Sequence, residues 1–169
     1  MKALILLATL VSAPNAERNG DDDAMNQTKV KATVQALFDA MRSADSTRLR
    51  TLFTDNAQLK TVQALPNSAS AQAKPKAAVL KEESVEAFIR AVGTPRKEVW
   101  DERIFDVEVK IDGELAMVWT KYEFYVDTTF SHCGVNLFQL LKQSDGWKIF
   151  SVTDTRRKSP CERRLDAHK

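Results

Sequence analysis

The sequence predicts a single α+β domain in which about three helices cover one face of a curved antiparallel sheet. Two observations lead to this fold class. Apolar residues recur at helical spacing in the first half of the chain, whereas long runs after Pro95 alternate apolar and polar residues and are joined by tight turns. The 169 residues, of which 43% are hydrophobic and 28% charged, suffice for one soluble domain with a core.

Residues 1–16 have the pattern of a secretory signal peptide. Lys2 supplies a positive charge, residues 3–11 form a short apolar run, and small residues follow. Cleavage after Ala13 and cleavage after Ala16 both fit. A membrane span needs roughly 20 apolar residues, so we expect no membrane association once the signal is removed. The pattern predicts a periplasmic or secreted protein, with a buried N-terminal helix as the alternative.

The folded domain is expected over residues 26–161, between a disordered acidic linker at 17–25 and a basic tail at 162–169. Asn26 or Thr28 is placed to cap a first helix. Beyond the cap, apolar residues form one continuous stripe, which must pack on another element. The stripe consists of Val30, Val34, Leu37, Phe38 and Met41.

A short second helix and a strand are expected next. Asp45 or Ser46 can cap the helix, and the alternation over 57–62 is typical of a strand. Residues 64–76 have neither periodicity nor bulky side chains, which predicts a mobile loop. Residues 77–80 are then expected to resume the sheet.

A third helix is expected between Ser84 and Gly93. Serine at the first position can accept a capping hydrogen bond, and glycine at the last is well suited to end a helix. The apolar residues between them fall on one side of this helix. They are Val85, Phe88, Ile89 and Val92.

The first long hairpin is expected to turn at the Asp-Gly dipeptide of residues 112–113, a strong signal for a tight turn. A two-residue loop there pairs Ile111 with Glu114 and, farther along, Arg103 with Tyr122. Because side chains of a strand alternate between its two faces, Arg103 and Tyr122 are expected on the apolar inner face.

The last hairpin is expected to turn at residues 143–146. His132 and Cys133, although adjacent in sequence, then point to opposite faces of the sheet. The face of His132 also carries Asn136, Phe138, Ser151 and Thr153. The other face carries Cys133, Val135, Leu137, Phe150, Val152, Asp154 and Arg156.

The two apolar faces join into one surface only if the connection around residues 127–130 contains a bulge or an odd-length turn. We expect the bulge, because the alternative sets a charged face against an apolar one. The joined surface mixes apolar walls with a few polar groups, as small-molecule sites do. The candidate ligand-binding residues on it are Arg103, Tyr122, His132, Asn136, Phe138, Ser151 and Thr153.

The order of elements resembles that of the nuclear transport factor 2-like superfamily, an α+β cone with a cystatin-like sheet. The stretch "VWTKYEFYVDTTFSHCGVNLFQLLKQSDGWKI", residues 118–149, is similar to its exported bacterial branch, known as SnoaL-like or "putative lumazine-binding". The triplet at 132–134 and the Gly-Trp-Lys-Ile motif at 146–149 are the more specific parts. The resemblance implies a pocket roofed by helices. It implies no single activity, because the superfamily includes isomerases, dehydratases, cyclases, ligand binders and interaction modules.

Three functions are open at this point. The first is an exported protein that binds a partly apolar or aromatic small molecule in the cone. The second is a cofactor-independent isomerase, dehydratase or cyclase in which His132 is catalytic, with Tyr122 and Arg103 as electrostatic partners. The third is a dimeric interaction module whose cone is filled by side chains.

Several other function classes are not expected. The chain has no nucleophile elbow, no phosphate-binding loop and no histidine-carboxylate cluster with metal spacing, so neither a cofactor nor a metal is predicted. A net charge of +2 without a basic stripe does not favour nucleic acid as a partner.

Two further expectations concern the outer face of the sheet. Apolar residues among its charges predict a homodimer through this face; they are Val135, Leu137, Phe150 and Val152. Export would place the two cysteines in an oxidising compartment, where a bond between Cys133 and Cys161 is expected, because the turn at 159–160 can bring the chain back across the strand.

Overall fold

The computed structural model describes residues 20–63 and 78–161 of the 169-residue chain. The predicted signal peptide at 1–16, the predicted loop at 64–76 and the predicted basic tail at 162–169 lie outside the described residues. In the part that is described, no helix is both long and apolar enough to cross a membrane.

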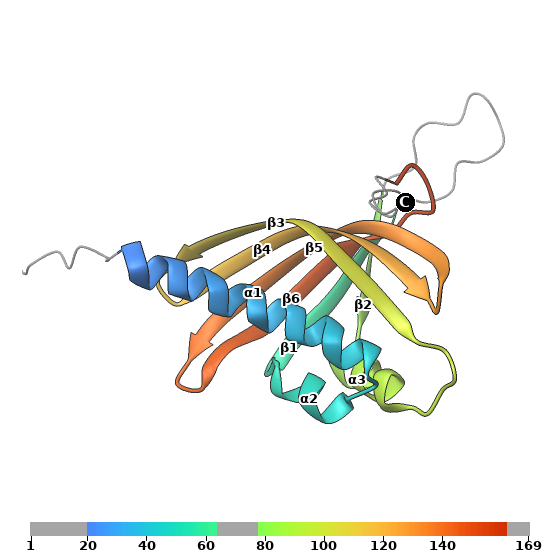
Figure 1. Cartoon of the computed structure of the whole chain (residues 1–169), viewed down its shortest axis with the longest axis horizontal. Coiled ribbons are helices and arrows are strands. Elements are labelled where there is room, and N and C mark those ends of the chain that lie inside the picture. The colour runs from blue at the N-terminus through green and yellow to red at the C-terminus, as the bar shows by residue number, and fades with distance from the viewer. Residues whose placement is uncertain (1–19, 64–77, 162–169) are drawn as a thin grey trace, which may run out of the picture.

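The described residues form an α+β fold in which a curved sheet bends around the helices (Figure 1). The helices are α1 (Gly20–Arg42), α2 (Ser46–Thr51) and α3 (Val85–Gly93). The strands are β1 (Phe53–Gln63), β2 (Val79–Glu83), β3 (Trp100–Asp112), β4 (Leu115–Val126), β5 (Thr129–Gln143) and β6 (Gly146–Thr155). The expected fold class is confirmed.

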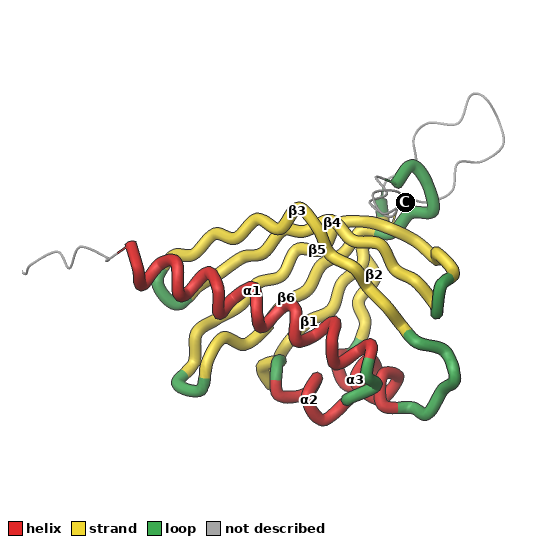
Figure 2. The backbone as a smooth tube through the Cα atoms, viewed as in Figure 1, coloured by secondary structure: helices red, strands yellow, loops and turns green. Residues whose placement is uncertain are grey.

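The sheet has the strand order β2-β1-β6-β5-β4-β3. Neighbouring strands are antiparallel except β1 and β6, which run parallel. Figure 2 shows the strands curving over the helices, with α1 lying along the concave side and α2 and α3 near one end of it. The parallel pairing of β1 with β6 is an exception within the expected antiparallel sheet.

Helix α1 begins at Gly20, earlier than the predicted caps, so the part of the expected linker from residue 20 onward is helical. Asp22 and Asp23 lie in the first turn, where negative charge interacts favourably with the partial positive charge of a helix N-terminus. The predicted apolar stripe is buried against the sheet, and the rings of Phe38 and Phe138 pack edge to face with centroids 5.9 Å apart.

The caps of α2 and α3 are as predicted. Asp45 accepts a hydrogen bond from the Arg48 amide, and Ser84 accepts one from the Ala87 amide. Helix α3 ends at Gly93, where a Cβ atom would lie 2.5 Å from the Ser46 hydroxyl oxygen. Glycine therefore allows α3 to pack directly against the start of α2.

A bulge in β3 reverses the expected facing of its first half. The hairpin turn pairs Ile111 with Ala116 instead of Glu114, which leaves the faces near the turn as predicted. Between Phe105 and Glu108, however, β3 has one residue more than β4, and Asp106 adopts a left-handed conformation with φ 51°. Every side chain before the bulge consequently faces the side opposite to the one expected.

A second bulge, in β5, joins the two apolar faces. Phe124 pairs with His132 whereas Tyr125 pairs with Phe130, so Ser131 is the extra residue. The predicted joining is confirmed, and the bulge lies one residue beyond the expected range.

A third bulge, in β6, is one that the sequence did not predict. Leu140 pairs with Ile149, but Gln139 pairs with Ser151, which leaves Phe150 as the extra residue. From residue 151 onward the two faces of β6 are exchanged relative to the prediction.

Candidate functional site

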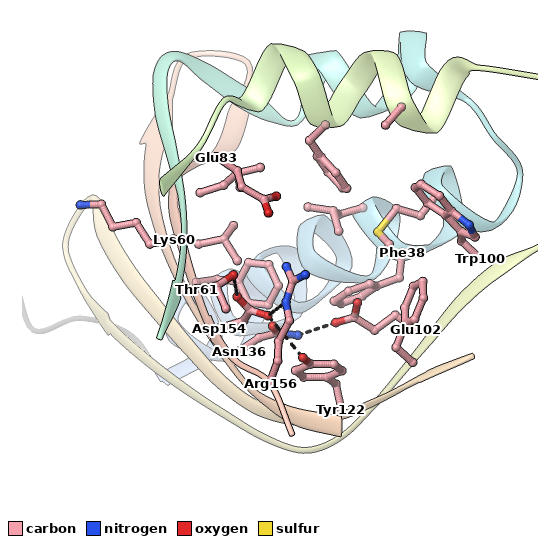
Figure 3. A pocket seen from close by; sticks show the side chains of 18 of the residues that line it. Phe38, Lys60, Thr61, Glu83, Trp100, Glu102, Tyr122, Asn136, Asp154 and Arg156 are labelled. Atoms are coloured by element: carbon pink, nitrogen blue, oxygen red, sulfur yellow. Dashed lines mark hydrogen bonds and ion pairs between the residues drawn. The ribbon is translucent and has the colours of Figure 1, made fainter. Parts of the chain in front are cut away.

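A cavity of about 670 Å³ lies between the concave face of the sheet and the helices. Much of its wall is aromatic: Phe38, Phe53, Phe88, Trp100, Phe124 and Phe138. Polar side chains gather on the sheet side, as Figure 3 shows, and we call them the polar cluster. The polar cluster consists of Thr61, Glu102, Tyr122, His132, Asn136, Asp154 and Arg156.

Four of the predicted site residues line this cavity: Tyr122, His132, Asn136 and Phe138. Three do not: Arg103, Ser151 and Thr153. The bulge in β3 pairs Arg103 with Glu123 on the outer face, where its guanidinium lies over the Tyr125 ring at 4.5 Å.

Ser151 and Thr153 are corrected for the same kind of reason. The bulge in β6 pairs them with Gln139 and Leu137 of β5, on the outer face. Their places in the cavity are taken by residues that the sequence placed outside. These are Val152, Asp154 and Arg156.

Asp154 is the centre of the hydrogen bonds in the polar cluster. Its carboxylate accepts hydrogen bonds from the Thr61 hydroxyl, from the Tyr122 hydroxyl at 3.3 Å and from Arg156 Nε at 2.6 Å. The guanidinium of Arg156 is partly desolvated, but this hydrogen bond and the charge of Asp154 outweigh that effect and raise the arginine pKa. Arg156 is therefore positively charged, and side chains from β1, β4 and β6 meet at Asp154.

Glu102 is an acid in largely apolar surroundings. Burial raises its pKa from 4.5 to about 7, an effect that the hydrogen bond donated by Asn136 Nδ2 at 2.7 Å only partly offsets. The negative charge of Asp154 adds to the increase. Near neutral pH the Glu102 carboxyl group is thus present in both protonated and ionised forms.

His132 stands between two aromatic rings in the cavity wall. Its ring centroid lies 5.0 Å from that of Phe124 and 5.7 Å from that of Tyr122, and Nδ1 lies 3.0 Å from the Ser131 hydroxyl. Burial lowers its pKa, and the positive charge of Arg156 lowers it further. The imidazole is therefore neutral over most of the physiological pH range. It can donate a hydrogen bond to a ligand or accept one from it.

Tyr122 is fixed as a hydrogen-bond donor. Its one hydroxyl proton is shared between the Thr155 carbonyl at 2.9 Å and the Asp154 carboxylate at 3.3 Å. Burial together with nearby negative charge raises the pKa of Tyr122 far above the ordinary value. Gly134 makes this arrangement possible: a Cβ atom there would lie 1.8 Å from the Thr155 carbonyl oxygen and 2.8 Å from the Tyr122 ring.

The His-Cys-Gly triplet therefore has three separate roles. His132 faces the cavity, Gly134 gives room to Tyr122, and Cys133 points to the outer face. The expected disulfide joins Cys133 to Cys161, with Cα atoms 6.0 Å apart. Backbone hydrogen bonds in both directions between Cys133 and Arg157 hold the same segment against β5.

The sequence missed Glu102, Asp154 and Arg156 as cavity residues. Each lies beyond a bulge, and counting alternation through a bulge assigns the wrong face. The signal that could have identified Glu102 is Asp106, because aspartate tolerates the left-handed conformation better than most residues. Among residues 20–63 and 78–161, no group of three or more His, Cys, Asp or Glu side chains is arranged to hold a metal ion.

Comparison with solved structures finds the same fold in several bacterial proteins. A protein of unknown function from Mycobacterium tuberculosis superposes with a TM-score of 0.64 at 13% identity, covering 84% of this chain and 78% of that one. A protein with a cystatin-like fold from Novosphingobium aromaticivorans gives 0.59 at 10% identity, covering 86% and 95%. A "putative dehydratase" from Streptomyces avermitilis gives 0.56 at 17% identity, covering 81% and 99%. At these identities the likeness shows the fold alone.

Comparison by sequence shows the family. No curated protein matches the chain. A family model described as "Putative lumazine-binding" matches residues 25–153, and the structures from Novosphingobium and Streptomyces are described as nuclear transport factor 2-like. The chain therefore belongs to the putative lumazine-binding family, and its fold is the one seen in the nuclear transport factor 2-like structures.

Proposed function

We propose that this protein binds a small molecule with a large apolar body and one polar end in the cavity of the cone. The observation that carries the proposal is the cavity itself: about 670 Å³, with aromatic walls and the polar cluster on one side. Ligand sites usually have this size and this mixture of surfaces. The same volume argues against the interaction module, for which the cone would have to be filled by side chains.

The test uses a neutral apolar dye, N-phenyl-1-naphthylamine, whose fluorescence rises when it leaves water. We expect saturable binding of one dye per chain. Ala87→Phe places a large ring on α3 where Ala87 lines the cavity, and it should abolish binding. Arg90→Phe introduces the same ring at an exposed position of the same helix and should leave binding intact. Absence of dye binding, or equal binding by both variants, would contradict the proposal.

A second candidate, proton-transfer catalysis without a cofactor, is supported by Glu102. A carboxyl group with a pKa of about 7 in an apolar cavity is suited to act as a general base or acid near neutral pH. Glu102 then replaces His132 as the group expected to move the proton, and Tyr122 lies near it in the polar cluster.

This second candidate can be tested without knowing the natural substrate. 5-Nitrobenzisoxazole opens when a base removes its ring proton, so it reports a reactive base in an apolar site. We expect a rate that rises with ionisation of Glu102, around pH 7, and falls at least tenfold in Glu102→Gln. If the rate is unaffected by Glu102→Gln but lost in His132→Gln, His132 and not Glu102 is the base that removes the proton.

Export of the chain is a further proposal. It is supported by the signal-peptide pattern of residues 1–16 and by the disulfide between Cys133 and Cys161, a bond that persists in oxidising compartments. N-terminal sequencing of the protein from a periplasmic or culture-medium fraction should begin after Ala13 or Ala16. Recovery of the chain with Met1 intact would contradict export.

A further inference from the structure

We propose that the polar end of the ligand is a carboxylate, and that it binds to the terminal amino groups of Arg156 while the apolar body fills the cavity. This inference rests on the proposed function, because it specifies the chemistry of the molecule that the cavity holds. The ligand class is that of aromatic or aliphatic carboxylic acids.

The first step is that Asp154 is already occupied as an acceptor. Its carboxylate accepts hydrogen bonds from Thr61, Tyr122 and Arg156 within the protein. A ligand donor would have to displace one of these partners. Asp154 therefore serves to position Arg156, and the hydrogen-bonding capacity left for a ligand lies elsewhere in the polar cluster.

The second step is the capacity of Arg156. In the described part of the chain its hydrogen bonding uses only Nε. A guanidinium group carries further donors on its two terminal nitrogens, and Figure 3 shows that end of Arg156 directed into the cavity. Two parallel N–H donors match the two oxygens of a carboxylate.

The third step is the balance of charge on the cavity wall. Arg156 is positive, and Asp154 and Glu83 are the negative groups that raise its pKa. The ammonium group of Lys60, in contrast, pairs with Glu82 at 3.9 Å and points away from the others in Figure 3. A protonated Glu102 adds no negative charge, and it can donate its own proton to an oxygen of the ligand. The donors that the polar cluster offers to a carboxylate are therefore the terminal amino groups of Arg156 and the protonated Glu102.

The surroundings of Glu102 also determine how pH affects binding. An added carboxylate nearby favours the protonated form of Glu102, so binding should take up protons and tighten as the pH falls from 8 to 6. The titratable and polar groups that line the cavity with Glu102 come from several strands. They are Lys60 of β1, Glu83 of β2, Tyr122 of β4, His132 and Asn136 of β5, Asp154 of β6, and Arg156, which directly follows β6.

The experiment compares an acid with its uncharged amide. We would titrate the purified protein with 1-naphthylacetate and with 1-naphthylacetamide at pH 6.5 by calorimetry. The wild type should bind the acid at least tenfold more tightly. Arg156→Met should weaken acid binding at least tenfold and change amide binding less than threefold. Arg103→Met is the matched control, because this arginine lies on the outer face, and it should keep the preference for the acid.

Other outcomes separate this inference from the function on which it rests. Equal affinities for acid and amide in the wild type, or a preference that survives in Arg156→Met, would overturn the carboxylate assignment while ligand binding stands. Failure of both naphthyl compounds and of the neutral dye to bind would overturn both proposals. If Arg156→Met does not fold, Arg156→Lys decides: it keeps the charge but loses the paired donors, and acid binding should still weaken severalfold.

Discussion

Glu102 is the residue on which the chemistry of the cavity depends most, and its protonation has a consequence for stability. The pKa of this carboxyl group is about 7 in the folded protein against 4.5 in the unfolded chain. Between these values the folded state holds the proton more tightly than the unfolded state, so stability falls as the pH rises from about 4.5 to 7 and the loss is complete above pH 7.

Replacing Glu102 by glutamine should therefore stabilise the protein at high pH. Glutamine keeps an oxygen that can accept the Asn136 hydrogen bond but cannot ionise. We expect Glu102→Gln to be more stable than the wild type by up to about 3 kcal/mol at pH 8, with the difference shrinking towards pH 4.5. Urea unfolding at a series of pH values measures this. Glu108→Gln, at an exposed position of the same strand, is the control. A difference that does not change with pH would contradict the buried acid.

Gly134 also shapes the site, because the absence of a side chain there leaves room for β6 and for Tyr122. A Cβ atom there would collide with the backbone of β6, since the Thr155 carbonyl oxygen would be 1.8 Å away. Gly134→Ala should destabilise the fold by about 3 kcal/mol or more and weaken dye binding as Tyr122 is displaced. Gly20→Ala, which meets no atom within 4 Å, should be nearly neutral. Unaltered stability of Gly134→Ala would contradict this close contact between β5 and β6.

At the scale of elements, the sequence was sufficient where a local signal decides the structure. The caps at Asp45 and Ser84, the end of α3 at Gly93 and the turn near residue 113 all follow from the preferences of individual residues. The start of α1 was missed, because an acidic segment reads equally as a solvated linker and as a favourable first turn.

The facing of side chains was predictable only as far as the next bulge. Tyr122, His132, Asn136 and Phe138 lie within stretches where alternation is unbroken from a correctly placed turn. The bulges in β3 and β6 are set by the curvature of the whole sheet, which no short stretch of sequence encodes strongly. One shifted residue was enough to exchange Arg103 for Glu102.

Cysteine labelling tests the bulge in β3 directly. In Glu102→Cys the thiol should face the cavity, and in Arg103→Cys it should face solvent on the other side of the sheet. We expect bound N-phenyl-1-naphthylamine to slow the reaction of the first variant with a maleimide at least fivefold and to leave the second unchanged. The reverse pattern would restore the regular alternation and remove Glu102 from the site.

For the whole molecule, the outer face of the sheet raises the question of assembly. Trp119 is 42% exposed there, and Leu137 pairs with it across the strands, whereas Val152 turns inward and no longer contributes to this face. The homodimer remains a prediction from these apolar side chains.

Light scattering at micromolar concentration should give the mass of a dimer for the wild type. Leu137→Lys should shift it to the mass of a monomer, because a charge would have to be buried in the interface. Met25→Lys, at an exposed position of α1 away from this face, should leave the dimer intact. A wild type with the mass of one chain would refute assembly through this face.

The central claim is that the cone holds a small molecule, and native mass spectrometry of gently purified, mature protein tests it most directly. We predict an added mass corresponding to one noncovalently bound molecule per chain. It should be absent from Ala87→Phe and retained by Arg90→Phe, and the released compound should carry a carboxyl group. Identical masses for bare polypeptide in all three proteins, together with failure of each to take up N-phenyl-1-naphthylamine, would contradict the claim.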